Sequence, residues 1–392
     1  MKKQKMVLTI MICFIVAAIA ALWTAVRIKT ETDSLTLLVN ESVSYPEARA
    51  YLFSSDVSEQ ISVSDNINYS KPGNYSIRYQ YRLFGFIPLK SHTVKVSVID
   101  AESPEIILKN GNVVFCRTGS QPSEPEYTVT DNCDSSEQIR ISIEDVSQDK
   151  KRLIACDASD NCSSATLQYV YGDIEETDFE PGKFHLRDYD INHVVCRRDG
   201  ALMSEQDFQQ IYFIGDSNFM NMMMYDSGIR PDRILARFAL TPQSLDHPVT
   251  YNKVEGFKSA LHLITEFQPK AVIIHMGFTA VTGNPLELAE SYGRRIDEIR
   301  GLCPDTQIIV SAITPITRDY AQQETQIQVN RANYCLMHMC EEKGIYMMDA
   351  SEILTGADGY GDPDHYQPDG LHIQGGDYEN YVNYVKEVIE FE

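Results

Sequence analysis

The hydrophobic pattern changes along the chain. From about residue 33 to 172, short runs alternate polar with apolar or aromatic residues, most clearly at 76–81 and 93–98. A period of two predicts strands with one buried face. Turn residues at 71–74 and 100–104 bound these two runs, because Pro, Gly, Asn and Asp favour turns. We therefore predict a hairpin within a small β-sandwich.

The same pattern continues beyond this hairpin. Strand-like runs at 105–108, 127–130 and 165–171 are separated by turns rich in Asp and Asn at 131–132 and 157–161. Side-chain oxygens in such turns can bind calcium, but the sequence contains no complete ligand loop. We therefore favour Asx turns between strands.

This region resembles the bacterial immunoglobulin-like and hyalin-repeat modules of surface proteins. In those modules a Thr-Asp-Asn turn and a later Ala-x-Asp turn recur, and here they fall at residues 130–132 and 155–161. The resemblance implies two tandem immunoglobulin-like domains, at 31–101 and 102–172, that act as spacers without catalytic function.

A different pattern begins near residue 206. Apolar runs alternate with stretches of helical periodicity, which predicts repeated βαβ units and a parallel sheet. The predicted strands lie at 211–214, 271–276, 307–313 and 345–348, and the predicted helices at 254–267, 286–302, 325–343 and 378–389. We expect a three-layer α/β domain over 206–392. The mixed-charge residues 173–205 are either a linker or a packed extension.

The N-terminus carries a long apolar run. Three lysines within the first five residues precede an uncharged stretch from Met6 to Val26, and Arg27 follows it. At about 1.5 Å per residue, this stretch is long enough to cross a hydrocarbon core of roughly 30 Å as a helix. We favour an uncleaved signal-anchor over residues 1–30, with cleavage after Ala25 as the alternative. The positive-inside tendency then places the bulk of the chain outside the cell.

The net charge of the chain disfavours one class of binding partner. A formal net charge of -22 disfavours binding to nucleic acid, because phosphate backbones would repel so acidic a protein.

The best disulfide candidates among the nine cysteines are Cys116, Cys133, Cys156 and Cys162. Their spacing does not match paired zinc ligands. We expect Cys303, Cys335 and Cys340 to be buried apolar residues.

Two short motifs in the α/β domain carry candidate chemistry. Ser217 follows Gly215 and Asp216 at the end of the first predicted strand, and Asp369 precedes His372 by three residues before the last predicted helix. A serine nucleophile needs a base that removes its proton and a third group that orients this base. Histidine and aspartate supply these two roles.

Taken together, these motifs resemble the SGNH (GDSL-like) hydrolase family over residues 206–392. The resemblance implies a flavodoxin-like sandwich in which Ser217 is the nucleophile, His372 the general base and Asp369 its orienting carboxylate. It also implies that the backbone N–H of Ser217 donates to the oxyanion.

The chain departs from the family pattern at the oxyanion hole. The family reads Gly-x-Asn where this chain has Gly277, Phe278 and Thr279, and the family's glycine after the second strand has no counterpart in 234–245. Ala236 or Ala239 can supply a backbone N–H instead, and Thr279 a hydroxyl. The candidate oxyanion residues are Ser217, Ala236, Gly277 and Thr279.

Two further histidines offer weaker alternatives. His275 lies inside an apolar run, which favours a buried core histidine, whereas His365 beside Asp364 competes for the role of base.

We expect a membrane-anchored extracellular serine esterase with no cofactor and no metal. Its expected substrate is an acylated carbohydrate or small ester. An acyltransferase with the same triad and a non-catalytic surface protein that binds glycan or a partner remain the alternatives.

Overall fold

The computed structural model describes residues 2–121, 124–198, 202–225, 227–320, 322 and 325–391, with side chains from Met6 onward. The chain forms two compact units. The first contains Met1–Ile107, Thr128–Glu144 and Arg152–Ala165, and the second contains Leu108–Tyr127, Asp145–Lys151 and Thr166–Glu392. The predicted residues 102–172 are thus shared between the two units.

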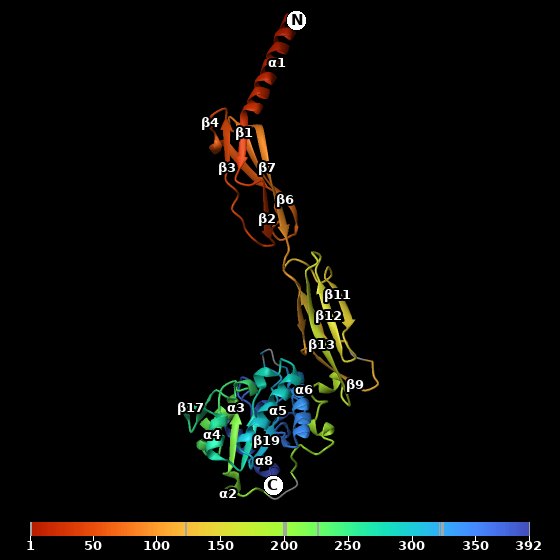
Figure 1. The fold of residues 1–392 in the computed structure, drawn as a ribbon, viewed down its shortest axis with the longest axis vertical. Coiled ribbons are helices and arrows are strands. Elements are labelled where there is room, and N and C mark those ends of the chain that lie inside the picture. Colours follow the sequence, from red (N-terminus) through yellow and green to blue (C-terminus); the bar gives the residue numbers. More distant parts are fainter. Residues whose placement is uncertain are drawn as a thin grey trace. The chain divides into compact units, whose positions relative to one another are not determined.

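The first unit begins with the apolar helix α1, Lys2–Ala25, and is otherwise built of strands (Figure 1). One sheet has the order β1-β3-β4, from Val26–Thr30, Ala48–Leu52 and Ser55–Asp56. The other has the order β2-β7-β6-β5, from Ser34–Leu38, Ile87–Ile99, Gly73–Leu83 and Ile61–Asp65. β6 and β7 pair antiparallel from Gly73↔Val98 to Leu83↔Ile87, which confirms the predicted hairpin.

The remaining β-strands continue this all-β region. β8 (Glu105–Leu108) pairs with β10 (Tyr127–Thr130), and β11 (Arg140–Asp145), β12 (Lys150–Cys156) and β13 (Cys162–Gly172) are neighbours in another sheet. The Asp-rich turns are Asx turns. Asp131 accepts hydrogen bonds from the backbone N–H of residues 133 and 134, and Asp157 from those of residues 159 and 161. The immunoglobulin-like character of this region stays a prediction.

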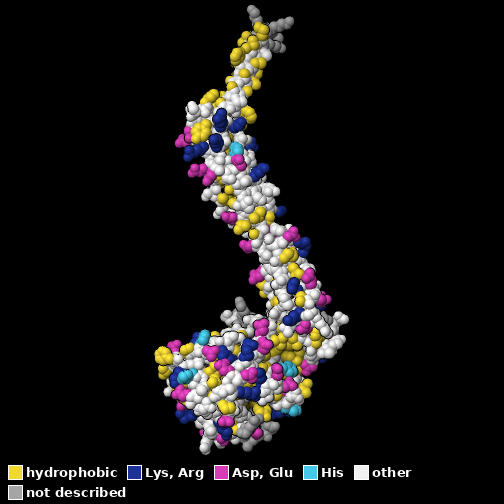
Figure 2. All heavy atoms as spheres, in the orientation of Figure 1, with side chains coloured by type: hydrophobic (Ala, Val, Ile, Leu, Met, Phe, Trp, Pro, Cys, Tyr) yellow, Lys and Arg dark blue, Asp and Glu magenta, His cyan; other side chains and the backbone are white. Residues whose placement is uncertain are grey.

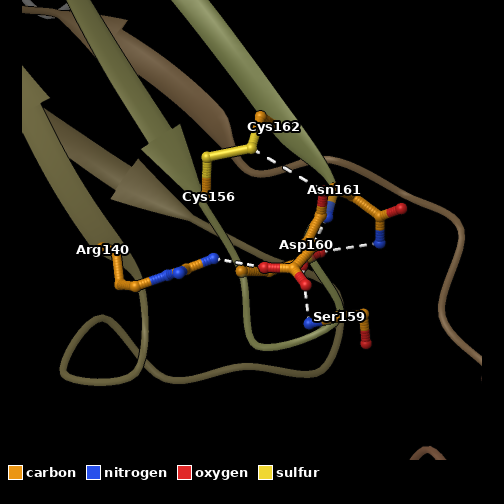
Figure 3. Close-up of a disulfide and its surroundings, with 7 residues drawn as sticks. Arg140, Cys156, Ser159, Asp160, Asn161 and Cys162 are labelled. Carbon is orange, nitrogen blue, oxygen red and sulfur yellow. Dashed lines mark hydrogen bonds and ion pairs between the residues drawn. A yellow bond between two sulfur atoms is a disulfide. The ribbon is translucent and has the colours of Figure 1, made fainter.

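One disulfide joins Cys156 to Cys162 across a turn (Figure 3). Asp160, at the tip of this turn, forms an ion pair with Arg140. The other two cysteines of the predicted set are placed differently. Cys133 Sγ lies 3.4 Å from Asp100 Oδ2, and Cys116 is buried in β9 (Val113–Arg117). The prediction that Cys116 and Cys133 form disulfides is therefore wrong, because neither is disulfide-bonded in the structure.

The second unit is built around a seven-stranded sheet of order β17-β16-β15-β14-β18-β19-β20. The five strands from β15 to β20 are parallel, and their order along the chain is 2-1-3-4-5, the flavodoxin-like order. They span Ile234–Ala236, Ile211–Gly215, Ala271–His275, Gln307–Ser311 and Tyr346–Met348. Every residue of the central strands β14 and β18 is buried, as expected for a sheet that is covered on both faces.

Helices cover both faces of this sheet, which confirms the predicted three-layer architecture (Figure 1). One core includes side chains of α4 (Ala260–Phe267), α5 (Pro285–Leu302) and α6 (Gln326–Lys343). The opposite core includes α3 (Ser217–Met224), α7 (Ser351–Leu354) and α8 (Tyr378–Val388). Local capping sets the helix ends. A capping box at Thr325 starts α6, and Gly344 with φ +59° ends it.

The helix predicted at 254–267 is wrong in its first part. Residues Val254–Ser259 form β17, which pairs antiparallel with β16 (Pro248–Tyr251), and the helix begins only at Ala260. Asn252 and Lys253 both have positive φ, so they form the two-residue turn that favours a hairpin. This turn adds two antiparallel strands to the edge of the parallel sheet.

The segment after β13 is a packed extension of the second unit. Phe179, Leu186 and Val195 are buried in the same core as α6, and Val195 forms a parallel bridge with Met347 of β20. A short helix, α2 (Glu205–Phe208), leads into β14. Residues 173–205 were predicted to be either a linker or a packed extension. The part from 173 to 198 is a packed extension.

Candidate active site

Ser217 is the first residue of α3 and directly follows the buried end of β14. Asp216 caps this helix, because its Oδ1 accepts the N–H of Asn218 at 3.1 Å. A Cβ at Gly215 would lie 2.5 Å from Phe219 Cδ2 and 2.7 Å from the carbonyl oxygen of His275. Only glycine therefore fits between the strand and the helix that carries Ser217.

The carboxyl of Asp216 is buried beside a buried histidine. His275 Nε2 lies 3.9 Å from Asp216 Oδ1, and His275 Nδ1 lies 3.2 Å from the carbonyl oxygen of Ala312. The ring of His275 also stacks on Phe219, with 5.2 Å between centroids. These contacts confirm the prediction of a satisfied core histidine. Burial raises the pKa of Asp216, although His275, the Asn218 N–H and His372 act in the opposite direction.

Asp369 and His372 form a hydrogen-bonded pair. Their side chains meet at 2.6 Å, between Asp369 Oδ2 and His372 Nδ1. Asp369 Oδ1 accepts the backbone N–H of Leu371 and of His372, each at 3.0 Å. Burial by itself would raise the pKa of Asp369, but these hydrogen bonds outweigh it and lower the pKa. Asp369 is therefore ionised at neutral pH and fixes the histidine through Nδ1.

This arrangement leaves the second ring nitrogen of His372 available. His372 Nε2 is buried and has no hydrogen-bond partner among the described residues. An ionised carboxylate only accepts hydrogen bonds, so in the neutral ring the proton lies on Nδ1, toward Asp369.

The loop that carries the Asp369–His372 pair rests on the segment after β19. Gly370 has φ +72°, and a Cβ there would lie 2.2 Å from Thr317 Oγ1. The backbone N–H of Thr317 donates to the carbonyl oxygen of Gly370 at 2.9 Å. Glycine is therefore required between Asp369 and His372 for two reasons, its backbone angle and the close contact.

Asn218 connects the two motifs. Its Oδ1 accepts the backbone N–H of Ile373 at 3.1 Å, and its Nδ2 lies 3.4 Å from Thr314 Oγ1. Tyr378 also donates its hydroxyl to the Asn218 carbonyl oxygen at 2.8 Å. Since Asn218 follows Ser217 and Ile373 follows His372, these bonds bring the predicted nucleophile and base to the same end of the sheet.

The residues predicted for the oxyanion hole divide into two groups. Ala236 is fully buried inside β15, and Gly277 donates its N–H to the Leu240 carbonyl oxygen at 3.0 Å. Ala239, in contrast, is exposed in the loop after β15 with φ +53°. Of the two alanines only Ala239 is thus exposed, and the N–H of Gly277 is already used in a bond within the protein.

Two other donors remain from the prediction. Ser217 is the first residue of a helix, so its N–H has no partner within the helix. Thr279 is exposed in the short turn Phe278–Ala280 that follows β18. Ser217, Ala239 and Thr279 each follow a different neighbouring strand of the sheet, at its carboxyl end.

His365 belongs to a separate pair. Its Nδ1 lies 2.9 Å from Asp377 Oδ1, at the start of α8, and Asp364 is not its partner. His365 shares with His372 the geometry of a histidine held by a carboxylate. The difference lies in their neighbours, because His372 adjoins the residue that hydrogen-bonds to Asn218.

One cluster of described residues has the composition of a metal site. Asp100, Asp131, Cys133 and Asp134, in the first unit, bring one ligand atom each within 4.8 Å of one another. Asp131 Oδ2 is buried without a hydrogen-bond partner among the described residues. Burial, followed by the hydrogen bond to Asp100, raises the pKa of the Cys133 thiol to about 12. Asp131 also accepts the backbone N–H of residues 133 and 134, and we assign no metal to this cluster.

The role of Asn218 was not predicted from the sequence. A weak signal for such a role was present in the sequence. Asparagine is disfavoured within helices, yet Asn218 stands in the first turn of a helix that is rich in methionine. Its partners, Thr314 and Ile373, are 96 and 155 residues away, so no local pattern identifies them.

Neither a family model nor a curated protein matches this chain. Among solved structures, a GDSL-like lipase from Bacteroides thetaiotaomicron VPI-5482 is similar at 12% identity, with a TM-score of 0.35, over 52% of this chain and 96% of the lipase. The protein named TesA is similar at 12% identity, with a TM-score of 0.33, over 45% of this chain and 94% of its own length. Similarity at this level assigns no activity to the chain.

Proposed function

We propose that the second unit is a serine ester hydrolase of the SGNH type. The observation that carries this proposal is the Asp369–His372 pair, with its 2.6 Å hydrogen bond and an unoccupied His372 Nε2, linked through Ile373 and Asn218 to Ser217. A serine at a helix N-terminus, a base and an orienting carboxylate are the three parts of nucleophilic acyl transfer.

The proposed reaction has two halves. In the first, Ser217 Oγ gives its proton to His372 Nε2 and attacks the ester carbonyl carbon. Collapse of the tetrahedral intermediate forms the acyl-serine ester, and the alcohol leaves with the proton from His372. In the second half, water gives a proton to His372 and attacks the acyl-serine. His372 then returns this proton to Ser217 Oγ as the carboxylic acid leaves, which restores the enzyme.

The oxyanion of each intermediate needs donors that are already in place. We assign this role to the N–H of Ser217, the N–H of Ala239 and the hydroxyl of Thr279. A left-handed backbone at Ala239 supports its assignment, since this conformation is unusual for alanine. Thr279 takes the position at which the family pattern has asparagine.

The proposed substrates are acyl esters, with O-acetyl groups on cell-envelope or environmental glycans as the leading class. This part rests on location. The segment Met6–Ala25 of α1 has a mean hydropathy of 2.7, and none of its residues is fully buried by other described residues. We propose that it spans the membrane as a single-pass anchor, with the short N-terminal tail in the cytoplasm and the bulk of the chain outside. A length of 20 residues suits a bilayer.

Labelling with a fluorophosphonate probe and hydrolysis of p-nitrophenyl acetate test the proposal. The full-length protein in detergent should react with the probe and release p-nitrophenol, and Ser217→Ala should abolish both. Ser62→Ala, an exposed serine of β5 in the first unit, serves as the matched control and should retain both. Absence of labelling in folded wild-type protein would favour the non-catalytic binding protein. Acetyl transfer to an added sugar in place of hydrolysis would favour the acyltransferase.

A further inference from the structure

Three exposed phenylalanines lie in the turns at one end of the first unit. Phe53 lies in the turn from β3 to β4, and Phe84 and Phe86 lie in the turn from β6 to β7. Their side chains are 73%, 76% and 69% exposed. Turns at the surface are usually formed by Gly, Asn, Asp, Pro or Ser, so an aromatic residue at each of these positions requires an explanation.

The backbone makes this choice of residue costly. Phe53 and Phe84 both have φ +54°, in the left-handed region, which costs an L-residue with a bulky side chain roughly 1–2 kcal/mol. Glycine or asparagine would adopt the same angle more readily. The rings gain little within the protein, since Phe84 and Phe86 are 6.5 Å apart and otherwise exposed. The contacts among the described residues therefore do not account for these aromatic side chains.

These turns adjoin the end of α1. The N–H of Phe53 donates to the carbonyl oxygen of Ala25, the last helical residue, at 3.2 Å. Leu22 of α1 packs with Leu52 and Leu83, the residues before the two turns, around Val26. The helix therefore continues into the β-sheets without an intervening linker, and the aromatic turns lie where the apolar helix ends.

Aromatic and basic side chains lie beside this junction. Trp23 is 51% exposed, and Lys90 Nζ lies 3.7 Å from the centroid of its ring. Arg82 adjoins the turn from β6 to β7, and Asp56, near Phe53, is hydrogen-bonded to Ser58. Figure 2 shows hydrophobic side chains along the helix and around its junction with the sheets, with both basic and acidic side chains among them.

We propose that this end of the first unit inserts into the interface of the bilayer that α1 spans. Phe53, Phe84 and Phe86 would lie at the level of the lipid headgroups together with Trp23, where aromatic side chains are enriched. Lys90 and Arg82 would meet the lipid phosphates. The inference rests on the proposed membrane anchor. Its consequence is that the first unit is held against the membrane by several contacts and does not swing freely on one helix.

Tryptophan quenching in lipid vesicles tests this proposal, because Trp23 is the single tryptophan of the chain. The full-length protein is reconstituted in phosphatidylcholine and phosphatidylglycerol vesicles that contain lipids brominated near the headgroup. In a Trp23→Phe background, Phe84→Trp and Phe86→Trp should each lose more than half of their emission. Leu38→Trp should keep its emission, because Leu38 is an exposed apolar residue of β2 that pairs with Ile99, at the opposite end of the β6–β7 hairpin.

The outcomes separate this inference from the anchor itself. Quenching of wild-type Trp23 reports that α1 is inserted. If Trp23 is quenched while Phe84→Trp and Phe86→Trp behave like Leu38→Trp, the interfacial contact is overturned and the anchor stands. If Trp23 is also unquenched, both the anchor and the interfacial contact are overturned.

Discussion

Asn218 Oδ1 accepts the backbone N–H of Ile373 across 3.1 Å, although 155 residues separate them in the chain. Both residues are buried, at 4% and 2% exposure. Asn218 follows Ser217 and Ile373 follows His372, so this bond fixes the spacing between Ser217 and His372. A buried hydrogen bond of this kind leaves an unsatisfied N–H when its acceptor is removed.

Asn218→Ala should therefore reduce kcat by about 10- to 100-fold, because small displacements of a nucleophile from its base have effects of this size. KM should change little, since Asn218 is a positioning residue. Asn221→Ala, on the same helix, is the control and should keep near wild-type kinetics. Steady-state hydrolysis of p-nitrophenyl acetate measures both. An increase in KM with an unchanged kcat would contradict the positioning role.

Replacement of His372 and replacement of His365 should have different effects on esterase activity. His372→Ala should lower kcat/KM by about 10³-fold or more, because the proposed base is removed. His365→Ala should have a minor effect, since the His365–Asp377 pair is not joined to Asn218. The same esterase assay measures both variants, with thermal unfolding as a check of folding. Equal losses would mean that His365 also takes part in the reaction.

Thr279 should act through its hydroxyl. Thr279→Val keeps the shape but removes the donor, and we expect kcat to fall by about 10²- to 10³-fold, the usual effect of losing one oxyanion donor. Thr279→Ser keeps the hydroxyl and should retain most activity. The comparison of kcat for these two variants is the measurement. Equal activity of the valine and serine variants would remove Thr279 from the oxyanion hole.

Gly370 should tolerate substitution less well than a glycine with the same backbone angle. Gly370→Ala adds a left-handed alanine and a 2.2 Å contact with Thr317 Oγ1, whereas Gly228→Ala, at φ +76°, meets no atom within 4 Å. We expect Gly228→Ala to lower the free energy of unfolding by about 1 kcal/mol and Gly370→Ala to lower it further. Gly370→Ala should also reduce kcat, because it displaces the loop of His372. Denaturant unfolding and esterase assays of both variants measure this difference.

The buried carboxyl of Asp216 should make stability depend on pH. Folding raises its pKa above the ordinary value of 3.8, so the unfolded chain loses this proton first as the pH rises. Ionisation therefore costs stability above the ordinary value and costs nothing well below it. Asp216→Asn keeps an oxygen that can cap α3 and removes this cost.

The variant should thus gain stability relative to wild type at about pH 8, and this gain should shrink as the pH falls toward about 4. Urea unfolding of both proteins at several pH values measures the difference. A gain that does not change with pH would show that Asp216 ionises alike in the folded and unfolded chains.

Local patterns in the sequence determined the elements of this protein. Alternation in the β-hairpin, the apolar strands and amphipathic helices of the α/β unit, and the positions of Ser217, Asp369 and His372 all follow from residues close together in the chain. Periodicity and turn chemistry act within a few residues, so the sequence contains this information directly. The helix wrongly expected at 254–259 arose because a hairpin turn at Asn252 and Lys253 was not recognised.

Contacts between distant segments were decided by the tertiary structure. Only the folded chain selects Asp377 as the partner of His365, Asn218 as the link between the two motifs, and Ala239 over Ala236 as the exposed residue after β15. It also places the thiol of Cys133 beside the carboxylate of Asp100. These choices depend on which loops meet at the end of the sheet. Residues far apart in sequence become neighbours only when the strands pair, and no local pattern records that distance.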